Sequence, residues 1–156
     1  MLISPDSHLM TPEGQYFWSQ ARVEQAWENS RKEYSEALAS GDYKKVVLLM
    51  GAPGSGKSTW VSQNRHEGVI YFDATLKNAR ARAPFLQDAR AAGIPVEVVW
   101  LDTPLEECLR RNALRTPDRK VSEGIVTSMW EIMRRFPPDS HKEGSPFTLI
   151  RVQKES

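Results

Sequence analysis

The chain has 156 residues, of which 26% are charged and 40% are hydrophobic, and its formal net charge is +1. A near-neutral balance excludes binding of nucleic acid or membrane through net charge, so any such binding must come from a local patch. The one cysteine, Cys108, excludes an internal disulfide and is typical of a reducing compartment. We find no secretory pattern at the amino terminus and no apolar run near the ~20 residues of a membrane span. We therefore expect one cytoplasmic domain that does not associate with a membrane.

The amino-terminal quarter predicts a loose tail followed by a helix. Residues 1–11 show no pattern, and Thr11 and Pro12 then provide a capping residue and a first helical position. One apolar face continues to about Ala39, and its members are Tyr16, Val23, Trp27, Tyr34 and Leu38. We expect residues 1–44 to form this tail and helix, before an α/β core at 45–152. The helix would cover an open sheet edge; the alternative is a dimer or partner surface.

The rest of the chain alternates between strand and helix patterns. Apolar runs rich in β-branched residues predict strands at 44–50, 68–73, 94–102 and 147–152. Helical patterns occupy 78–93, 103–115 and 122–136, with Pro84 inside or at the start of the first and loops at 116–121 and 137–146. Thr103 is expected to cap the second of these helices, with Pro104 at its first position. This order predicts about four parallel strands with helices on both faces of the sheet.

A glycine-rich turn, "GAPGSGKSTW", joins the strand at 44–50 to the next helix. Gly51, Gly56, Lys57 and Ser58 match G-x-x-x-x-G-K-[ST]. Glycines let backbone N–H groups surround phosphate oxygens, a lysine reaches the β and γ phosphates, and a serine hydroxyl can ligate Mg²⁺. A chance glycine turn is the alternative, and the strand before the turn, the helix after it and Thr59 next to Ser58 favour a phosphate-binding loop over that alternative. The residues predicted to bind ATP or GTP with Mg²⁺ are Gly51, Pro53, Gly54, Ser55, Gly56, Lys57, Ser58 and Thr59.

Asp73 ends the strand at 68–73 and lies at a spacing from Lys57 that fits one helix and one strand. A carboxylate there can accept the proton of a phosphoryl acceptor or position Mg²⁺ through water, and both roles remain open. The alternative is a solvated turn aspartate. A GTPase would carry an N-K-x-D base-reading motif, and the sequence contains none.

Cationic residues gather at the end of the helix at 103–115. Arg110, Arg111 and Arg115 are followed by Arg119 and Lys120. Arg111 and Arg115 are four residues apart, so they share a helix face and could close over a phosphate. The alternative is a solvated basic helix face. Trp60, just after the glycine turn, could lie in the core or stack on a base.

Five segments together resemble the phage-type polynucleotide 5′-kinase family: "GAPGSGKSTW", "FDATLKNARAR", "AGIPVEVVWLDTPLEECLRRNALR", "VSEGIVTSMWEIM" and "KEG". The resemblance covers roughly residues 45 to 150. It implies transfer of the γ-phosphoryl of ATP to a hydroxyl, in that family a nucleic acid 5′-OH. By matched position, Lys57 and Ser58 would handle ATP and Mg²⁺. Arg111 and Arg115 would be the lid arginines of the "RNxxR" motif, with Arg115 contacting the transition state.

The chain departs from that family after its first helix. Members carry an Asp-x-x-Arg element, whose Asp is the general base and whose Arg grips the acceptor, and later a second strand that ends in Asp-x-Thr/Asn. Here there is one such strand: Asp73 has the spacing of the base, whereas "DATLKNAR" looks like the second element, with Leu76 where the Arg would stand. Lys77, Arg80 and Arg82 are the candidates to replace that grip.

These observations predict a three-layer α/β P-loop NTPase or kinase domain with an added amino-terminal helix. We expect an ATP- and Mg²⁺-dependent phosphotransferase that acts on a nucleic acid 5′-OH or a nucleotide-like molecule, with Lys57, Asp73, Arg111 and Arg115 in catalysis. Ser58 would bind Mg²⁺ directly and Asp73 through water. The alternative is a nucleotide-binding module or weak ATPase that acts on a partner through its amino-terminal helix. The sequence leaves the oligomeric state open.

Overall fold

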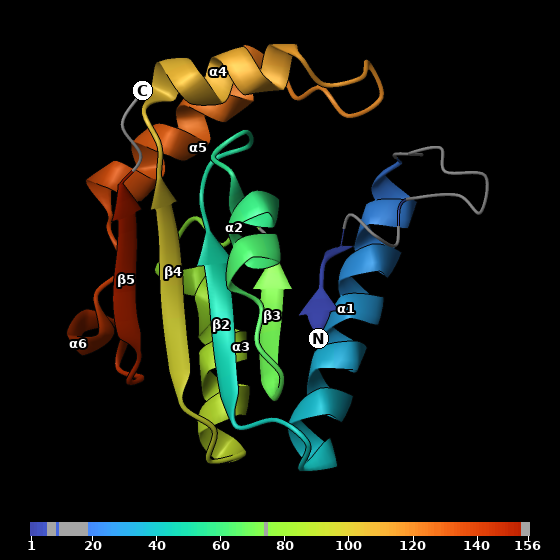
Figure 1. The fold of residues 1–156 in the computed structure, drawn as a ribbon, viewed down its shortest axis with the longest axis vertical. Coiled ribbons are helices and arrows are strands. Elements are labelled where there is room, and N and C mark those ends of the chain that lie inside the picture. Colours follow the sequence, from blue (N-terminus) through green and yellow to red (C-terminus); the bar gives the residue numbers. More distant parts are fainter. Residues whose placement is uncertain (6–8, 10–18, 74, 154–156) are drawn as a thin grey trace.

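A parallel β-sheet forms the centre of the molecule (Figure 1). The computed structural model describes residues 1–5, 9, 19–73 and 75–153. The strands of the described chain, in the spatial order β1-β3-β2-β4-β5, are β1 (Leu2–Ile3), β3 (Val69–Asp73), β2 (Lys45–Met50), β4 (Val96–Asp102) and β5 (Thr148–Gln153). Every neighbouring pair is parallel, so all carboxyl ends meet at one edge of the sheet.

Helices cover both faces of this sheet. They are α1 (Gln20–Ser40), α2 (Lys57–Asn64), α3 (Ala79–Ala91), α4 (Leu105–Ala113), α5 (Glu123–Arg135) and the short α6 (Ser140–Glu143). Alternate residues of β2 face opposite layers: Leu48 and Met50 lie in one apolar cluster with α1 and α3, whereas Leu49 lies in another with Val61 of α2. The sheet is therefore buried on both sides, as parallel sheets usually are. The predicted three-layer α/β architecture is confirmed.

The long helix α1 begins later than the sequence predicts. Ser19 is extended, and its side chain accepts a hydrogen bond from the Arg22 backbone at 3.2 Å, so the helix starts at Gln20. The predicted start at Thr11 and Pro12, and the apolar residue Tyr16, lie outside the described residues. The helix ends before Gly41, whose φ of 79° requires the left-handed conformation.

Helix α1 packs against one face of the sheet, beside the edge strand β1 (Figure 1). The ring of Tyr34 meets Phe72 and Phe85 edge-on, with centroids 5.9 and 5.2 Å apart, and Trp27 lies beside the same two rings. The buried Tyr34 hydroxyl donates to the Phe85 carbonyl at 2.7 Å, and burial raises the pKa of Tyr34. The packing interpretation of this helix thus agrees with the structure, and α1 lies beside the edge strand, but its contacts are to the face of the sheet and do not cover an open edge.

The strand β1 occupies the edge that α1 was expected to cover. Leu2 pairs with Tyr71 and Ile3 with Phe72, and Ile3 is completely buried. The Met1 ammonium donates to the Val69 carbonyl at 3.0 Å. The predicted loose tail therefore contributes a fifth strand, where the sequence indicates about four. A strand of two residues is too short to show an alternating pattern.

Two elements differ from expectation, the start of α4 and the short helix α6, and the structure decides between the two expected positions of Pro84. Pro104 precedes α4 as its capping position, and Thr103 makes no cap because its hydroxyl donates to the Ser55 carbonyl at 2.7 Å. Pro84 lies inside α3, which starts after Asn78, whose side chain accepts from the Ala81 backbone. The predicted loop at 137–146 contains α6, capped by Asp139. Within the described residues we find no helix with the length and apolarity that crossing a bilayer requires.

Candidate functional site

The glycine-rich turn lies at the carboxyl edge of the sheet, between β2 and the first residue of α2 (Figure 1). Gly54 and Gly56 have φ values of 82° and 99°, a region that side chains rarely adopt. Gly54 has a second constraint, since a Cβ there would lie 2.5 Å from the Cys108 carbonyl oxygen of α4. At Gly51 a Cβ would collide with the Ser55 side chain. These glycines therefore allow both the turn and the close approach of α4.

Two side chains of α2 point into this turn. The Lys57 ammonium donates to the Gly51 carbonyl at 2.9 Å, so it lies inside the turn. The Ser58 hydroxyl donates to the Asp73 carboxylate at 3.1 Å. Asp73 reaches Ser58 because β3 lies next to β2 in the sheet and ends at the same edge. The structure thus places the strand-end carboxylate directly beside the glycine-rich turn, as its sequence spacing predicts. We call this turn, which begins at Gly51 and leads into α2, the phosphate turn because its sequence is the motif of phosphate-binding loops.

A pocket of about 300 Å³ opens at this point. Its lining residues are Gly54, Ser55, Gly56, Lys57, Ser58, Thr59, Asp73, Arg111 and Arg115. Gly51 and Pro53, which were also predicted to bind nucleotide, do not line it; Gly51 contributes through its carbonyl to Lys57. The pocket joins three cationic side chains to one carboxylate, an excess of positive charge that suits a polyphosphate.

Glu107 orients Arg111 toward the turn, a role that the sequence did not reveal. The Nε of Arg111 donates to Glu107 at 2.9 Å, and its Nη1 donates to the Gly54 carbonyl at 3.4 Å. Arg110 also binds Glu107 but is exposed and lies outside the pocket. Hydrogen bonds from Arg110 and then Arg111 lower the pKa of Glu107 to about 2. The carboxylate is consequently ionised at physiological pH, and its charge can anchor Arg111.

Arg115 enters the same pocket from a loop rather than from a helix face. Helix α4 ends at Ala113, so the expectation that Arg111 and Arg115 share one helix was wrong. The buried Asn112 closes this loop: its Nδ2 donates to the Val121 carbonyl at 2.6 Å and its Oδ1 accepts from the Val121 N–H at 3.0 Å. The only sequence signal for these two hydrogen bonds was the polar residue between the two arginines, Asn112.

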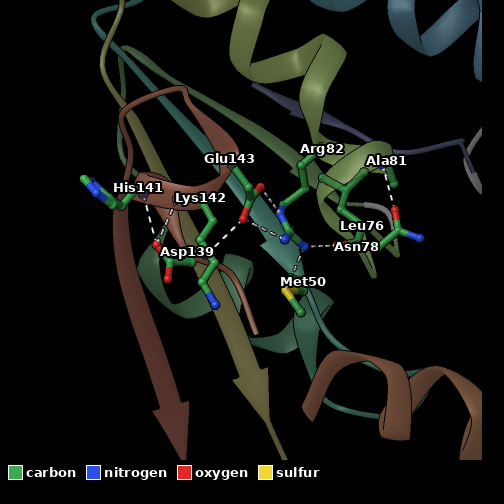
Figure 2. Close-up of polar contacts among 9 residues, drawn as sticks. All are labelled: Met50, Leu76, Asn78, Ala81, Arg82, Asp139, His141, Lys142 and Glu143. Carbon is green, nitrogen blue, oxygen red and sulfur yellow. Dashed lines mark hydrogen bonds and ion pairs between the residues drawn. The ribbon is translucent and has the colours of Figure 1, made fainter. Parts of the chain in front are cut away.

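Three basic residues were candidates to grip an acceptor, and the structure removes Arg82 from that role. Its guanidinium is buried and paired with Glu143 (Figure 2). Arg80 is exposed and Lys77 half-buried, and neither lines the pocket. The acceptor grip that the family resemblance implies is therefore not supplied by Arg82.

Asp102 and Trp60 also lie outside the pocket. The Asp102 carboxylate, at the end of β4, is buried between Arg151, at 2.9 Å, and Arg134, at 3.6 Å. Trp60 packs against Tyr71, with ring centroids 6.5 Å apart, in the apolar cluster between α2 and the sheet. Trp60 therefore belongs to the packing of α2, and Asp102 to a structural ion-pair group.

The side chains at the turn fit a magnesium–nucleotide complex. Mg²⁺ prefers oxygen ligands and commonly binds through one or two protein groups together with phosphates and waters. The Ser58 hydroxyl and the Asp73 carboxylate, in direct contact, offer that donor set. In the described parts of the chain, no group of three or more His, Cys, Asp or Glu forms a metal cage. The donor set thus suits an ion that is held mainly by its nucleotide.

A solved structure shares this arrangement of strands and helices. The chain aligns with one from the crystal structure of the AvrRxo1-ORF1:-ORF2 complex with a TM-score of 0.52 and 15% identity, over 88% of this chain and 65% of that one. The chain has the fold of a P-loop NTPase domain. At this identity the likeness concerns the fold alone.

Two sequence comparisons agree with the P-loop fold. Residues 63–138 match the AAA domain family AAA_33, a P-loop NTPase family that includes kinases. This match starts after the phosphate turn, so it does not depend on the G-x-x-x-x-G-K-[ST] motif. The chain is also 28% identical, over 86 residues, to GTPase Era from Erythrobacter litoralis (strain HTCC2594). That match covers 55% of this chain and 26% of the GTPase, so the chain spans about a quarter of this relative.

Proposed function

We propose that this P-loop domain is a cytoplasmic phosphotransferase that moves the γ-phosphoryl of ATP to the hydroxyl of a nucleic acid end or a nucleotide-like molecule. One observation carries the proposal: a single pocket gathers Lys57, the Ser58–Asp73 pair and two arginines of separate segments, Arg111 and Arg115. A module that only binds a nucleotide needs the turn and its lysine, but it does not need the two arginines. Arginines that close over the γ-phosphate stabilise charge that develops during transfer.

In the proposed reaction the acceptor oxygen forms a bond to the γ-phosphorus while the bond to the β–γ bridging oxygen breaks. ADP leaves with that electron pair, and the acceptor hydroxyl passes its proton to solvent water. The bound Mg²⁺ would neutralise charge on the β and γ phosphates. Lys57 would add a second cation from inside the turn, and Arg115, which lines the same pocket from a loop, would contact the transferred group. The Ser58 hydrogen bond favours a metal-positioning role for Asp73 over that of a general base.

ATP is the proposed donor rather than GTP. The name of the curated relative specifies GTP, but its match covers only part of that protein. The present sequence contains no N-K-x-D motif to read a guanine. A direct comparison of Kd values for ATP and GTP by calorimetry with Mg²⁺ checks this choice, and a preference for GTP would contradict it.

A transfer screen with γ-labelled ATP tests the proposed activity. Its acceptors are oligonucleotides with 5′-OH ends, nucleosides and water. We expect Mg²⁺-dependent label on one hydroxyl acceptor, and loss of both labelling and ATP affinity in Lys57→Ala, because its charge is the main cation of the turn. The matched control is Lys44→Ala, an exposed lysine just before β2. Label that appears only as inorganic phosphate would contradict transfer.

A second candidate is a nucleotide-binding module that hydrolyses ATP slowly and acts on a partner. The observation in its favour is that Arg82 is buried in an ion pair and that neither Lys77 nor Arg80 lines the pocket, so none of the three candidates for the acceptor grip lies in it. The solved neighbour comes from a complex of two components, which also makes a partner worth testing. Nucleotide binding without any labelled hydroxyl product in the screen would favour this candidate.

A further inference from the structure

An ion pair in the interior, between Arg82 and Glu143, lies beside Met50, the residue that precedes the glycine-rich turn (Figure 2). Arg82 of α3 is 1% exposed and its counter-charge, the Glu143 side chain of α6, is 6% exposed. We propose that Glu143 and Arg82 are a positioning pair that holds the segment after Asp73 and thereby sets the carboxylate for Mg²⁺. The inference rests on the proposed function, because it assigns a role to residues behind that magnesium site.

Glu143 binds two of the three guanidinium nitrogens of Arg82, and the third nitrogen contacts other groups. The Nε and Nη2 of Arg82 each donate to a different oxygen of Glu143 at 3.0 Å, which is the paired arrangement that fixes an arginine plane. Nη1 is then directed at the Leu76 carbonyl, at 2.8 Å, and lies 3.5 Å from the Met50 sulfur. Glu143 therefore determines where the third edge of Arg82 points.

Both of these further contacts adjoin the proposed site. Met50 is the last residue of β2 and directly precedes Gly51 of the phosphate turn. Leu76, completely buried, belongs to the short segment between Asp73 and the start of α3. A single guanidinium thus touches the chain just before the turn and just after the magnesium-positioning carboxylate. Leu76 lies three positions after Asp73 in the sequence, so the proposed link between the ion pair and the carboxylate rests on this proximity; Ala74 between them lies outside the described residues.

Stability of the fold alone does not account for an arginine at this position. Arg82 is the fourth residue of α3, close to the positive end of the helix dipole, where a cation is unfavourable. A buried ion pair is often no more stable than well-packed apolar residues of similar volume. What an apolar pair cannot supply is the hydrogen bond to the Leu76 carbonyl. That bond is the specific contribution of the charged pair.

Glu143 is itself held in place by its surroundings in α6. Its second oxygen also accepts the backbone N–H of Asp139 at 2.9 Å, and Asp139 caps the helix by accepting from His141 and Lys142 (Figure 2). The Gly144 carbonyl accepts from Arg90 of α3 at 3.3 Å, which is a second contact between α6 and α3. The short helix therefore presents Glu143 to Arg82 in a defined orientation.

Binding of Mn²⁺, followed by electron paramagnetic resonance with ATP present, tests the pair separately from turnover. The variants are Glu143→Gln and an apolar double variant, Arg82→Met with Glu143→Leu. We expect both to weaken Mn²⁺ binding to the protein–ATP complex by about tenfold or more, the usual effect of removing groups that orient a metal ligand. ATP affinity measured in EDTA should be unchanged. Glu97→Gln, which breaks the Lys45–Glu97 pair at the other end of the sheet, is the matched control.

Thermal unfolding of the same proteins separates positioning from stability. The double variant leaves no buried charge, so its unfolding midpoint should approach that of the wild type even if Glu143→Gln unfolds early. A well-folded double variant with wild-type Mn²⁺ affinity would overturn the inference. If the wild type binds Mn²⁺ with ATP but transfers no phosphoryl group, the proposed function fails and weakened binding in the variants still supports the pair. A wild type without Mn²⁺ binding overturns both.

Discussion

The hydroxyl of Ser58 donates a hydrogen bond to the carboxylate of Asp73 across 3.1 Å. This bond joins the first turn of α2 to the end of β3, two elements that the sheet brings together because β2 and β3 are parallel neighbours. A hydroxyl and a carboxylate in contact beside a phosphate turn are the protein ligands expected for nucleotide-bound Mg²⁺.

Asp73→Asn keeps the size of the side chain but removes its charge. We expect turnover to fall by about 10²-fold or more, because Mg²⁺ loses its anionic partner while the turn remains intact. ATP affinity in EDTA should change little, and single-turnover kinetics at varied Mg²⁺ concentration provide the measurement. Asp102→Asn is the control: it lies outside the pocket and should lower the unfolding temperature, since Arg151 and Arg134 lose their partner. If Asp102→Asn lowered turnover more than Asp73→Asn does, Asp102 would be the carboxylate that acts on Mg²⁺ and Asp73 the structural one.

Arg115→Ala should reduce kcat on the order of 10²-fold or more with little change in ATP affinity, as removal of a transition-state charge contact does. The comparison variant is Arg110→Ala, whose side chain lies outside the pocket and shares Glu107 with Arg111. We expect only a small effect there, because Arg111 retains its own bond to Glu107. Equal losses in the two variants, measured by steady-state kinetics, would rule out the lid role of Arg115.

Gly54→Ala tests the close approach of α4 to the phosphate turn. Gly54 and Gly41 both have φ near 80°, so alanine strains each by a similar amount, about 1 kcal/mol. Only at Gly54 does the added methyl group meet backbone, 2.5 Å from the Cys108 carbonyl, whereas nothing lies within 4 Å at Gly41. We therefore expect Gly54→Ala to weaken ATP binding and lower stability more than Gly41→Ala does. Calorimetry and denaturant unfolding would show similar values for both if α4 can simply move away.

The effect of acid on the stability of the protein through Glu107 follows from the lowered pKa of this residue. Its folded value of about 2 lies below its ordinary value of 4.5, so ionised Glu107 stabilises the folded state at pH values above 4.5. That contribution is lost as the pH falls through about 2. The stability difference between wild type and Glu107→Gln should thus be constant from about pH 5 to 9 and shrink below pH 4.5. Denaturant titrations at each pH measure it, and a change near neutral pH would contradict the assignment.

Helix α1 is expected to be part of the folded core. Tyr34→Ala removes a buried ring that contacts Phe72 and Phe85, and should cost roughly 3–5 kcal/mol of unfolding free energy. Lys32→Ala, whose side chain is 74% exposed on the same helix, should cost little and is the control. Similar stability of these two variants by denaturant unfolding would reopen the interpretation of α1 as a partner surface.

Much of the site could be predicted because its parts are local or follow from sheet geometry. The phosphate turn is contiguous in sequence, and glycines at 54 and 56 carry the positive φ values that such a turn needs. Asp73 follows from a general property of parallel sheets, whose carboxyl ends meet at one edge. The joining of Arg111 with Arg115 was also expected, although a loop and not a shared helix face brings them together.

The parts that could not be predicted depend on partners that are distant in sequence. An arginine such as Arg82 is usually exposed, and its burial depends on a counter-charge that is distant in sequence, Glu143 of α6. Thr103 has the sequence of a helix cap, but the Ser55 carbonyl competes for its hydroxyl. β1 spans two residues and α6 four, so neither is long enough for periodicity to distinguish it from a loop.

The position of α1 in the chain has a consequence for folding during synthesis. The aromatic rings of Trp27 and Tyr34 find their partners on Phe72 and Phe85, which leave the ribosome later. At a synthesis rate of roughly 5–20 residues per second, the apolar face of α1 is exposed for several seconds before its partners are made. During that interval the nascent helix is an amphipathic segment with an uncovered apolar stripe, and transiently exposed apolar surface of this kind is prone to aggregate.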